Sequence, residues 1–166
     1  MSRTARWSVF CVVFAGVAGA SVPVAHSEQV HLQLVLMLNS PRQLIEIPDE
    51  RGRLRLARFE ATARVYQDGQ ARGGALLEQG NENYEFTFER AELVAEADVV
   101  QRLTLWGRGL KISGSKEQEF DFVAQVTPSA AGPDIIDYDL EDGFVYVKPA
   151  FEAEGTMDVV AATGAS

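Results

Sequence analysis

Polar and apolar residues alternate along much of this chain, and a period of two predicts β-strands that bury one face. The clearest stretch runs from Tyr84 to Glu89, where three aromatic residues alternate with two glutamates and a threonine. A second stretch runs from Val30 to Leu38, and we expect its end to be buried on both faces and to stop at Asn39-Ser40-Pro41. A third begins at Leu54, and its phase slips after Ala57, which predicts a β-bulge.

Turn residues separate the predicted strands. Asp68-Gly69 predicts a two-residue type I′ hairpin, because that turn needs positive φ at both central residues, with a return strand from about Ala71 to Leu77. Gly80-Asn81 predicts the next turn. Residues 89–98 are rich in Ala, Glu, Leu and Arg, which favours a short helix over a continuing strand. Further strands are expected at about 144–148 and 151–160.

A hairpin with its turn at Gly114-Ser115 is the best-defined unit of the sequence. Counting back from this turn places a phenylalanine opposite each of two strand glycines, and a ring that covers a glycine restores packing on a sheet. The same register places an arginine opposite an aspartate on the other face, as a cross-strand ion pair. The predicted pairs are Gly109 with Phe120, Gly107 with Phe122 and Arg108 with Asp121.

About eight short strands with turns between them predict an all-β fold, either a single antiparallel β-sandwich or a small β-barrel. An outer-membrane barrel is a third option, which the lack of repeated ten-residue strands with aromatic girdles disfavours.

The first twenty residues have the three parts of a cleavable signal peptide. Arg3 and Arg6 supply the positive start, and residues 7–17 form an apolar run too short to span a bilayer. Ala18-Gly19-Ala20 fits the cleavage pattern of small residues. We therefore expect export to the periplasm or the extracellular space. The expected organisation is a signal peptide over 1–20, with cleavage after Ser27 as the alternative, a β domain over 28–160 and a flexible C-terminus over 161–166.

Charge is distributed unevenly along the chain. The 15 basic and 24 acidic residues give a formal net charge of −9, and removal of Arg3 and Arg6 with the leader leaves thirteen against twenty-four, a net of −11. Residues 42–72 hold seven arginines against five acids, a net of +2, whereas residues 73–166 hold six basic against eighteen acidic residues, a net of −12. This acidity argues against nucleic acid and anionic lipid surfaces as main partners.

Few chemical groups suit catalysis or cofactor binding. Cys11 is the only cysteine and lies in the leader, so we expect no disulfide in the mature chain, and no second apolar run predicts a transmembrane segment. Carboxylates are too numerous on the strands to single out a catalytic pair, so we name no catalytic residue. Residues 134–142 are expected to form an acidic loop exposed to solvent, in which Asp137, Asp139 and Glu141 alternate. These three residues are the candidate ligands for Ca²⁺, the one cofactor considered.

Two groups of residues are candidates for binding. Trp106, Leu110 and Ile112 share one face of their strand, and they form an apolar binding patch if that face meets water or belong to the core if it is covered. Arg51, Arg53 and Arg55 place three guanidinium groups on one strand face, for an anionic ligand or an acidic partner, or to protect a sheet edge.

The expected function is that of an exported, non-enzymatic β domain. It would bind a small apolar ligand or an unidentified protein partner of the cell envelope. The first alternative is a Ca²⁺-dependent sandwich that binds glycans or surfaces, and the second is a hydrolase that uses carboxylates.

Overall fold

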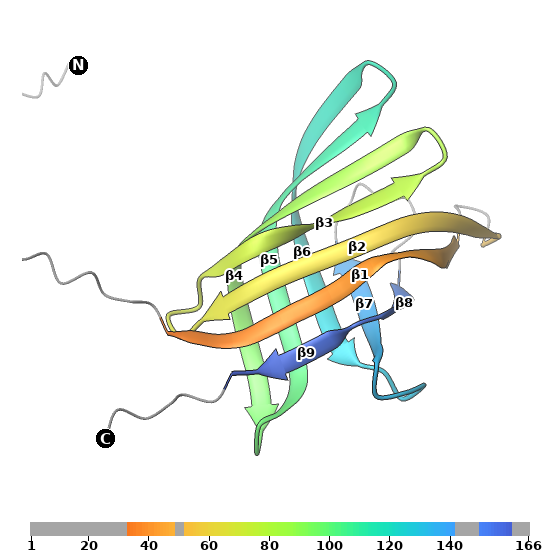
Figure 1. The fold of residues 1–166 in the computed structure, drawn as a ribbon. Helices are drawn as coiled ribbons and strands as arrows, with labels where there is room; N and C mark the ends of the chain where they lie inside the picture. The colour runs from red at the N-terminus through yellow and green to blue at the C-terminus, as the bar shows by residue number, and fades with distance from the viewer. Residues whose placement is uncertain (1–32, 49–51, 142–149, 161–166) are drawn as a thin grey trace, which may run out of the picture. The chain divides into compact units, whose positions relative to one another are not determined.

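The computed structural model describes residues 33–48, 52–141 and 150–160, and within them all regular structure is β-strand. Nine antiparallel strands form one sheet (Figure 1). The strands are β1 (Leu34–Pro48), β2 (Leu54–Tyr66), β3 (Ala71–Gln79), β4 (Glu82–Glu96), β5 (Val99–Ser113), β6 (Lys116–Pro128), β7 (Ile135–Glu141), β8 (Ala150–Glu154) and β9 (Thr156–Val159).

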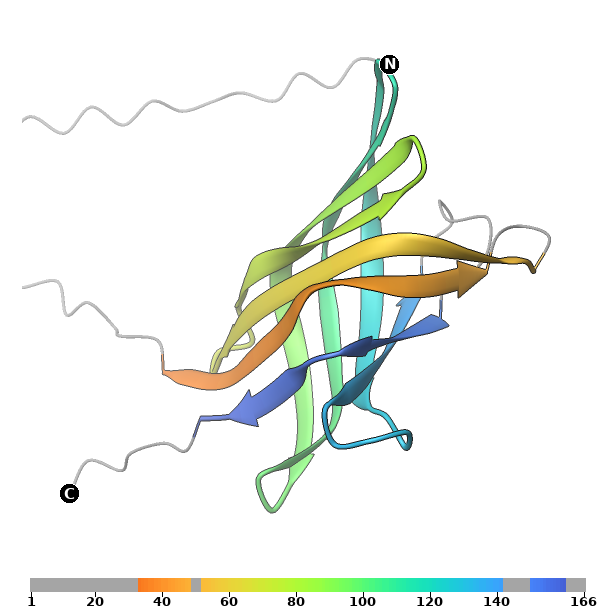
Figure 2. The ribbon, with the colours of Figure 1, turned by 45° about the vertical axis from the view of Figure 1, so that its right-hand side comes forward.

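The last two strands bring the ends of the sheet together. Neighbours in the sheet follow chain order from β1 to β8, and β9 then pairs with β1. Since only Gly155 separates β8 from β9, the final strand bends there and pairs with β7 on one side of the bend and β1 on the other. The result is a nearly closed, barrel-like sheet (Figures 1 and 2). The all-β, antiparallel prediction is confirmed, and the barrel rather than the two-sheet sandwich describes the fold.

The inward positions of every strand form one apolar core. Aromatic rings fill much of it in edge-to-face contacts, for example Phe86 with Phe122 at 5.0 Å and Phe59 with Tyr138 at 4.8 Å between centroids. Polar residues occupy most outward positions, so most strands alternate as a half-buried strand should. The buried aromatic residues of the interior are Phe59, Tyr84, Phe86, Phe88, Phe120, Phe122, Tyr138 and Phe151.

Beyond the β1–β9 pairing, side chains of β1 hold the seam with β8 and β7. At the bulge in β1 between Ser40 and Gln43, the Gln43 amide reaches β8. Its Nε2 donates to the Glu154 carbonyl at 2.8 Å and its Oε1 accepts from the Glu154 N–H at 2.7 Å. Beside it, Ser40 Oγ and Tyr138 OH share a buried hydrogen bond of 2.6 Å. At the bend itself, the Gly155 N–H donates to the Asp134 carbonyl at 2.9 Å.

The β5–β6 hairpin has the predicted register. Gly114-Ser115 forms the turn, and all three predicted pairs are present. A Cβ built on Gly109 would lie 2.2 Å from the Phe120 ring, and one on Gly107 would lie 1.9 Å from the Thr87 carbonyl oxygen. A side chain at Gly107 would therefore meet the backbone of β4, and one at Gly109 would meet an aromatic ring.

The helix predicted over residues 89–98 and the turn type predicted at Asp68-Gly69 were wrong. Residues 89–98 are not helical, because β4 continues to Glu96 and pairs with β5, and sheet pairing outweighs helix propensity there. Ala97 and Asp98 form the two-residue turn with positive φ at both positions, as type I′ requires. At Asp68-Gly69 only the glycine has positive φ, and the Tyr66 N–H bonds the Gln70 carbonyl, so that loop has three residues.

The first two strands also depart from prediction. β1 continues through Pro41 to Pro48, and its outward face is not covered, since Met37 is 41% exposed. The bulge lies in β1 rather than in β2, because Ala57 and Phe59 are both inward and continuous in phase. Leu54 and Leu56 point outward instead of into a core.

The acidic segment after Pro133 is a strand rather than a loop. Ile136, Tyr138 and Leu140 point inward in β7, and the acidic residues between them point outward. The strand predicted at 151–160 is confirmed as β8 and β9, whereas the one predicted at 144–148 lies outside the described residues, as does the expected signal peptide. In the described part of the chain, no helix has the length and apolarity to cross a bilayer.

Candidate functional site

Trp106, Arg108, Leu110 and Ile112 lie in a line on the outward face of β5, here called the β5 strip. Alternation places them there, because Gly107 and Gly109 point inward beneath the Phe122 and Phe120 rings. The three apolar residues are half-buried and do not belong to the core. They therefore lie at the surface, and their role in binding stays a prediction.

Carboxylates border the β5 strip on both sides. Leu110 lies between Glu85 of β4 and Glu119 of β6, and Ile112 faces Glu117. Five carboxylates border the strip, and all five are exposed. Two guanidinium groups lie among them, so these seven side chains (5 acidic, 2 basic) have a net charge of −3. Arg108 bridges one edge, with Nε 3.6 Å from the Glu89 carboxylate and Asp121 directly opposite. The border carboxylates are Glu85, Glu89, Glu117, Glu119 and Asp121, and the guanidinium groups are Arg90 and Arg108.

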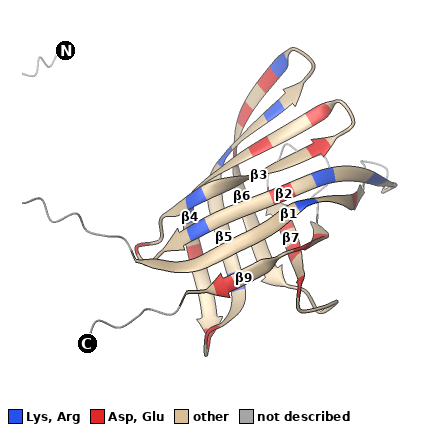
Figure 3. Cartoon of the chain, viewed as in Figure 1, with Lys and Arg blue, Asp and Glu red and all other residues tan. Residues whose placement is uncertain are grey.

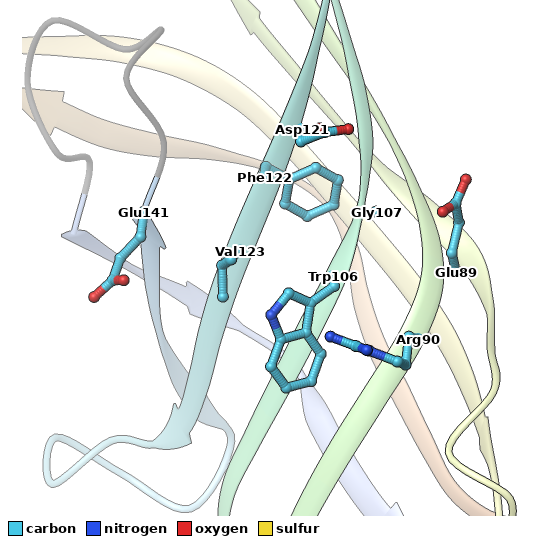
Figure 4. A pocket seen from close by; sticks show the side chains of 8 residues that line it. All are labelled: Glu89, Arg90, Trp106, Gly107, Asp121, Phe122, Val123 and Glu141. Atoms are coloured by element: carbon cyan, nitrogen blue, oxygen red, sulfur yellow. The ribbon is translucent and has the colours of Figure 1, made fainter. Parts of the chain in front are cut away.

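A groove of about 420 Å³ opens at the Trp106 end of the strip (Figure 4). The Arg90 guanidinium lies over the indole, 4.6 Å from its centroid, in a cation–π contact. Val123 lies on the other side of Trp106, and the Glu141 carboxylate lies beyond it on β7. Tryptophan and arginine are the residue types that dominate protein-binding hot spots. The groove is lined by Glu89, Arg90, Trp106, Gly107, Asp121, Phe122, Val123 and Glu141.

A half-buried polar cluster joins β4 and β5 on the inward side of the same hairpins. Lys111 Nζ lies 2.9 Å from the Glu82 carboxylate, which also accepts a 2.8 Å hydrogen bond from the Tyr84 hydroxyl. Burial raises the pKa of Glu82, but the hydrogen bonds from Lys111 and Tyr84 outweigh it and leave that pKa below its ordinary value. Burial lowers the pKa of Lys111, and the bonds to Glu82 and Tyr84 raise it above its ordinary value. The cluster thus holds β4 and β5 together as charged partners.

The predicted arginine stripe is not part of the strip. Arg53 and Arg55 are exposed in the outer part of the β1–β2 hairpin, and Arg51 lies outside the described residues. Arg55 pairs with Ile47 and so belongs to the face opposite Leu54 and Leu56. The structure therefore places the two predicted groups on separate strands.

Sequence reasoning missed a second apolar surface, here called the leucine patch. Leu44, Leu54 and Leu56 lie on the outward face of the β1–β2 hairpin and are 64%, 64% and 63% exposed. Glu46 pairs with Leu56 on that face, and Arg58 pairs with Leu44. The signal in the sequence was the phase of Leu54 and Leu56 relative to Ala57, which places these leucines opposite the core.

The candidate calcium ligands point outward at alternate positions of β7. Among the residues that the structure describes, no three carboxylate, His or Cys side chains converge on one point. Asp137 Oδ1 is nonetheless buried without a hydrogen-bond partner in the described structure, and Glu152 of β8 lies directly opposite. Calcium binding at Asp137, Asp139 and Glu141 stays a prediction.

Asp137→Asn is expected to stabilise the fold by about 0.5–1 kcal/mol, because it removes a cross-strand pair of like charges. Urea denaturation in the presence of a chelator measures the gain. Asp139→Asn is the matched control, since its cross-strand neighbours are the uncharged Gln125 and Ala150. If these carboxylates bind calcium, added Ca²⁺ will stabilise the wild type more than Asp137→Asn. A lower stability of Asp137→Asn in chelator would contradict the like-charge account.

No protein-family model matches this chain, and neither a curated protein nor a solved structure matches it. The residues of the β5 strip and the leucine patch are therefore the basis for inferring its function.

Proposed function

We propose that this chain is an exported, non-enzymatic binding module that holds a protein partner on its β5 strip. The leader over residues 1–20, or to Ser27 by the alternative cleavage, supports work in the periplasm or outside the cell. The observation that carries the binding proposal is a half-buried tryptophan, followed by Leu110 and Ile112, on a barrel face bordered by exposed carboxylates.

The outward face supports a protein partner better than the interior supports a small apolar ligand. Inward rings contact one another across the barrel, as Phe59 does with Tyr138 and with Phe151 at 4.8 and 4.9 Å. In that part of the interior, between β2, β7 and β8, the rings occupy the space that a ligand would need. The groove at Trp106, by contrast, opens on the surface.

The chemistry of the strip selects the partner. An apolar line with a net charge of −3 along its borders favours a segment that presents apolar side chains flanked by Lys or Arg. Arg90 and Arg108 restrict where the partner's cations can lie, because each guanidinium repels a like charge. The partner is therefore expected to carry an apolar and basic surface.

Three synthetic peptides of equal length test this proposal, with Leu alternating with Lys, Leu with Glu, and Ser with Lys. Trp7→Phe leaves Trp106 as the only tryptophan, so its fluorescence reports binding in the full chain. We expect the Leu–Lys peptide to bind and shift the emission, the Leu–Glu peptide not to bind, and the Ser–Lys peptide to bind weakly and only at low salt.

Leu110→Ser/Ile112→Ser should weaken Leu–Lys binding roughly tenfold or more, because the apolar contacts of the strip are lost. Leu44→Ser lies outside the strip and is the control that should bind as the wild type does. Equal binding of the Leu–Lys and Leu–Glu peptides, or unchanged affinity in the strip variant, would refute the proposal.

A further inference from the structure

Two arginines face each other on the outward surface of β2 and β3. Arg64 pairs directly with Arg72 and both are exposed, and Figure 3 shows two basic bands side by side on these strands. Like charges directly opposite each other destabilise a sheet. Arg42, Arg108 and Lys111 each form an ion pair with a glutamate, whereas among the described residues the two facing arginines form none. The pair is therefore a cost to the fold that a bound anion would relieve.

The donors of both guanidinium groups are available to a ligand. Arg72 lies over the Tyr66 ring, 5.6 Å from its centroid, and this cation–π contact uses the face of the ring and no hydrogen-bond acceptor. Of the nearby carboxylates, Glu89 of β4 has an ion pair of its own, and Asp158 of β9 lies two strands away from Arg64. Two guanidinium groups on facing residues present several N–H donors to one carboxylate, sulfate or phosphate group.

A groove of about 670 Å³ lies next to this arginine pair, on the outward face of β1 to β4. Thr62 and Gly74 are the next outward residues of β2 and β3, and Thr87 of β4 faces Gly74 from the other side. Because Gly74 has no side chain, the space between the two threonines stays open. Arg42 also lines the groove, but it is paired with Glu78 at 2.6 Å. The row beside the arginines is uncharged and the row beyond it is acidic: Asn39, Thr62, Gly74 and Thr87, then Glu60 and Glu85.

We propose that this surface binds an oligosaccharide that carries an anionic group, with the anion on Arg64 and Arg72 and the sugar hydroxyls in the groove. The groove shares Glu85 with the border of the β5 strip, but the inference does not depend on the partner proposed there. Threonine hydroxyls, the Asn39 amide and two carboxylates suit a ligand rich in hydroxyl groups, since a carboxylate only accepts hydrogen bonds. Glu60 is four residues from Arg64, roughly 13 Å along the strand, so its repulsion of the anion is largely screened at physiological salt.

The groove suits a peptide or a nucleic acid less well. Across it, β2 pairs with β1 and β3, and β3 pairs with β2 and β4, so an extended peptide finds no free backbone to which it could add as a strand. Bases stack on aromatic rings, but Tyr66 is in contact with Arg72, and Phe86 is buried in the core. A saccharide with a sulfate, phosphate or carboxylate group matches both ends of the surface.

An array of neutral, sialylated, sulfated and phosphorylated oligosaccharides tests the proposal with the full chain, with a phosphoserine peptide and single-stranded DNA on the same array. We expect charged oligosaccharides alone to be bound, and inorganic sulfate to compete. Arg64→Gln and Arg72→Gln should each weaken binding of the tightest oligosaccharide at least tenfold. Both should melt at the same temperature as the wild type or higher, because a pair of like charges is removed. Arg102→Gln is the control, since it removes the same charge from an exposed position of β5 and should bind as the wild type does.

Thr62→Val tests the saccharide part of the proposal, because it keeps the shape of the side chain and removes its hydroxyl. It should weaken binding of the charged oligosaccharide severalfold and leave the affinity for inorganic sulfate unchanged. If it changes neither, and sulfate alone binds as tightly as the oligosaccharide, the surface binds simple anions and the saccharide assignment is wrong.

The remaining outcomes also overturn the inference. The array contradicts it if no charged oligosaccharide is bound, if neutral ones are bound equally, or if the phosphopeptide or the DNA is bound more tightly. Unchanged affinity in Arg64→Gln and Arg72→Gln shows that the anion lies elsewhere. An equal loss in Arg102→Gln shows an effect of overall charge and not of this site.

Discussion

Gly107→Ala is expected to destabilise the fold by about 3 kcal/mol. A Cβ at this position would lie 1.9 Å from the Thr87 carbonyl oxygen and 2.9 Å from its carbonyl carbon. Both atoms belong to the backbone of β4, which pairs with β5 here. The methyl group therefore cannot be accommodated by a rotamer change and must push two paired strands apart.

Gly109 is the matched comparison, because its obstruction is a side chain. A Cβ there would meet the end of the Phe120 ring at 2.2 Å. Gly109→Ala should therefore cost less, about 2 kcal/mol, and Phe120→Leu should recover part of that cost by removing the ring atoms in contact. Urea denaturation of the single and double variants gives two coupling energies, one between Gly109→Ala and Phe120→Leu and one between Gly107→Ala and Phe122→Leu. If the second coupling energy is as large as the first, the backbone explanation for Gly107 is contradicted.

The features predicted correctly from sequence are those set by neighbouring residues. Once Gly114-Ser115 is taken as a two-residue turn, the register of β5 with β6 follows by counting, and with it the outward position of Trp106. The same local logic found the strand from Tyr84, since a strong alternation of aromatic and acidic residues suits one-sided burial.

The errors arose where pairing between distant segments decides the structure. Residues 89–98 have helix-favouring side chains, but their partner in β5 makes them a strand. The acidic run of β7 suggested a loop, although its inward Ile136, Tyr138 and Leu140 keep a period of two. Closure of the barrel by β9 on β1 joins residues about 120 positions apart, and no local pattern indicates it.

Part of the candidate site could be predicted from the sequence. Trp106, Leu110 and Ile112 follow from the hairpin, but their carboxylate border on β4 requires the β4–β5 register, which the helix prediction obscured. The leucine patch was missed because exposed leucines resemble the start of a core strand. Only the continuous phase from Ala57 to Phe59 shows that Leu54 and Leu56 face water.

Alkaline pH should loosen the barrel at its seam. Burial raises the pKa of Tyr138 to about 12, although the hydrogen bond with Ser40 lowers it somewhat. Below pH 10 the tyrosine is protonated in both states, so the stability that depends on it is fully present. Between pH 10 and 12 the unfolded chain releases this proton while the folded chain keeps it, which favours unfolding. Because the pKa of Tyr138 is about two pH units higher in the folded chain than in the unfolded chain, roughly 2–3 kcal/mol of stability is lost across that range.

Tyr138→Phe tests this assignment, because it removes the titrating group and keeps the ring packed against Phe59. At pH 8 it should cost about 1 kcal/mol, since Ser40 loses its buried partner. Between pH 10 and 12 its stability should fall less steeply than that of the wild type, with Tyr84 and Lys111 contributing the slope that remains, because both have a raised pKa. Ser40→Ala is the control: it breaks the same hydrogen bond but keeps the hydroxyl of Tyr138, so it should keep the full alkaline slope. If Tyr138→Phe and Ser40→Ala lose stability equally with pH, the seam is not the alkaline weak point, and the closure of the barrel does not depend on this proton.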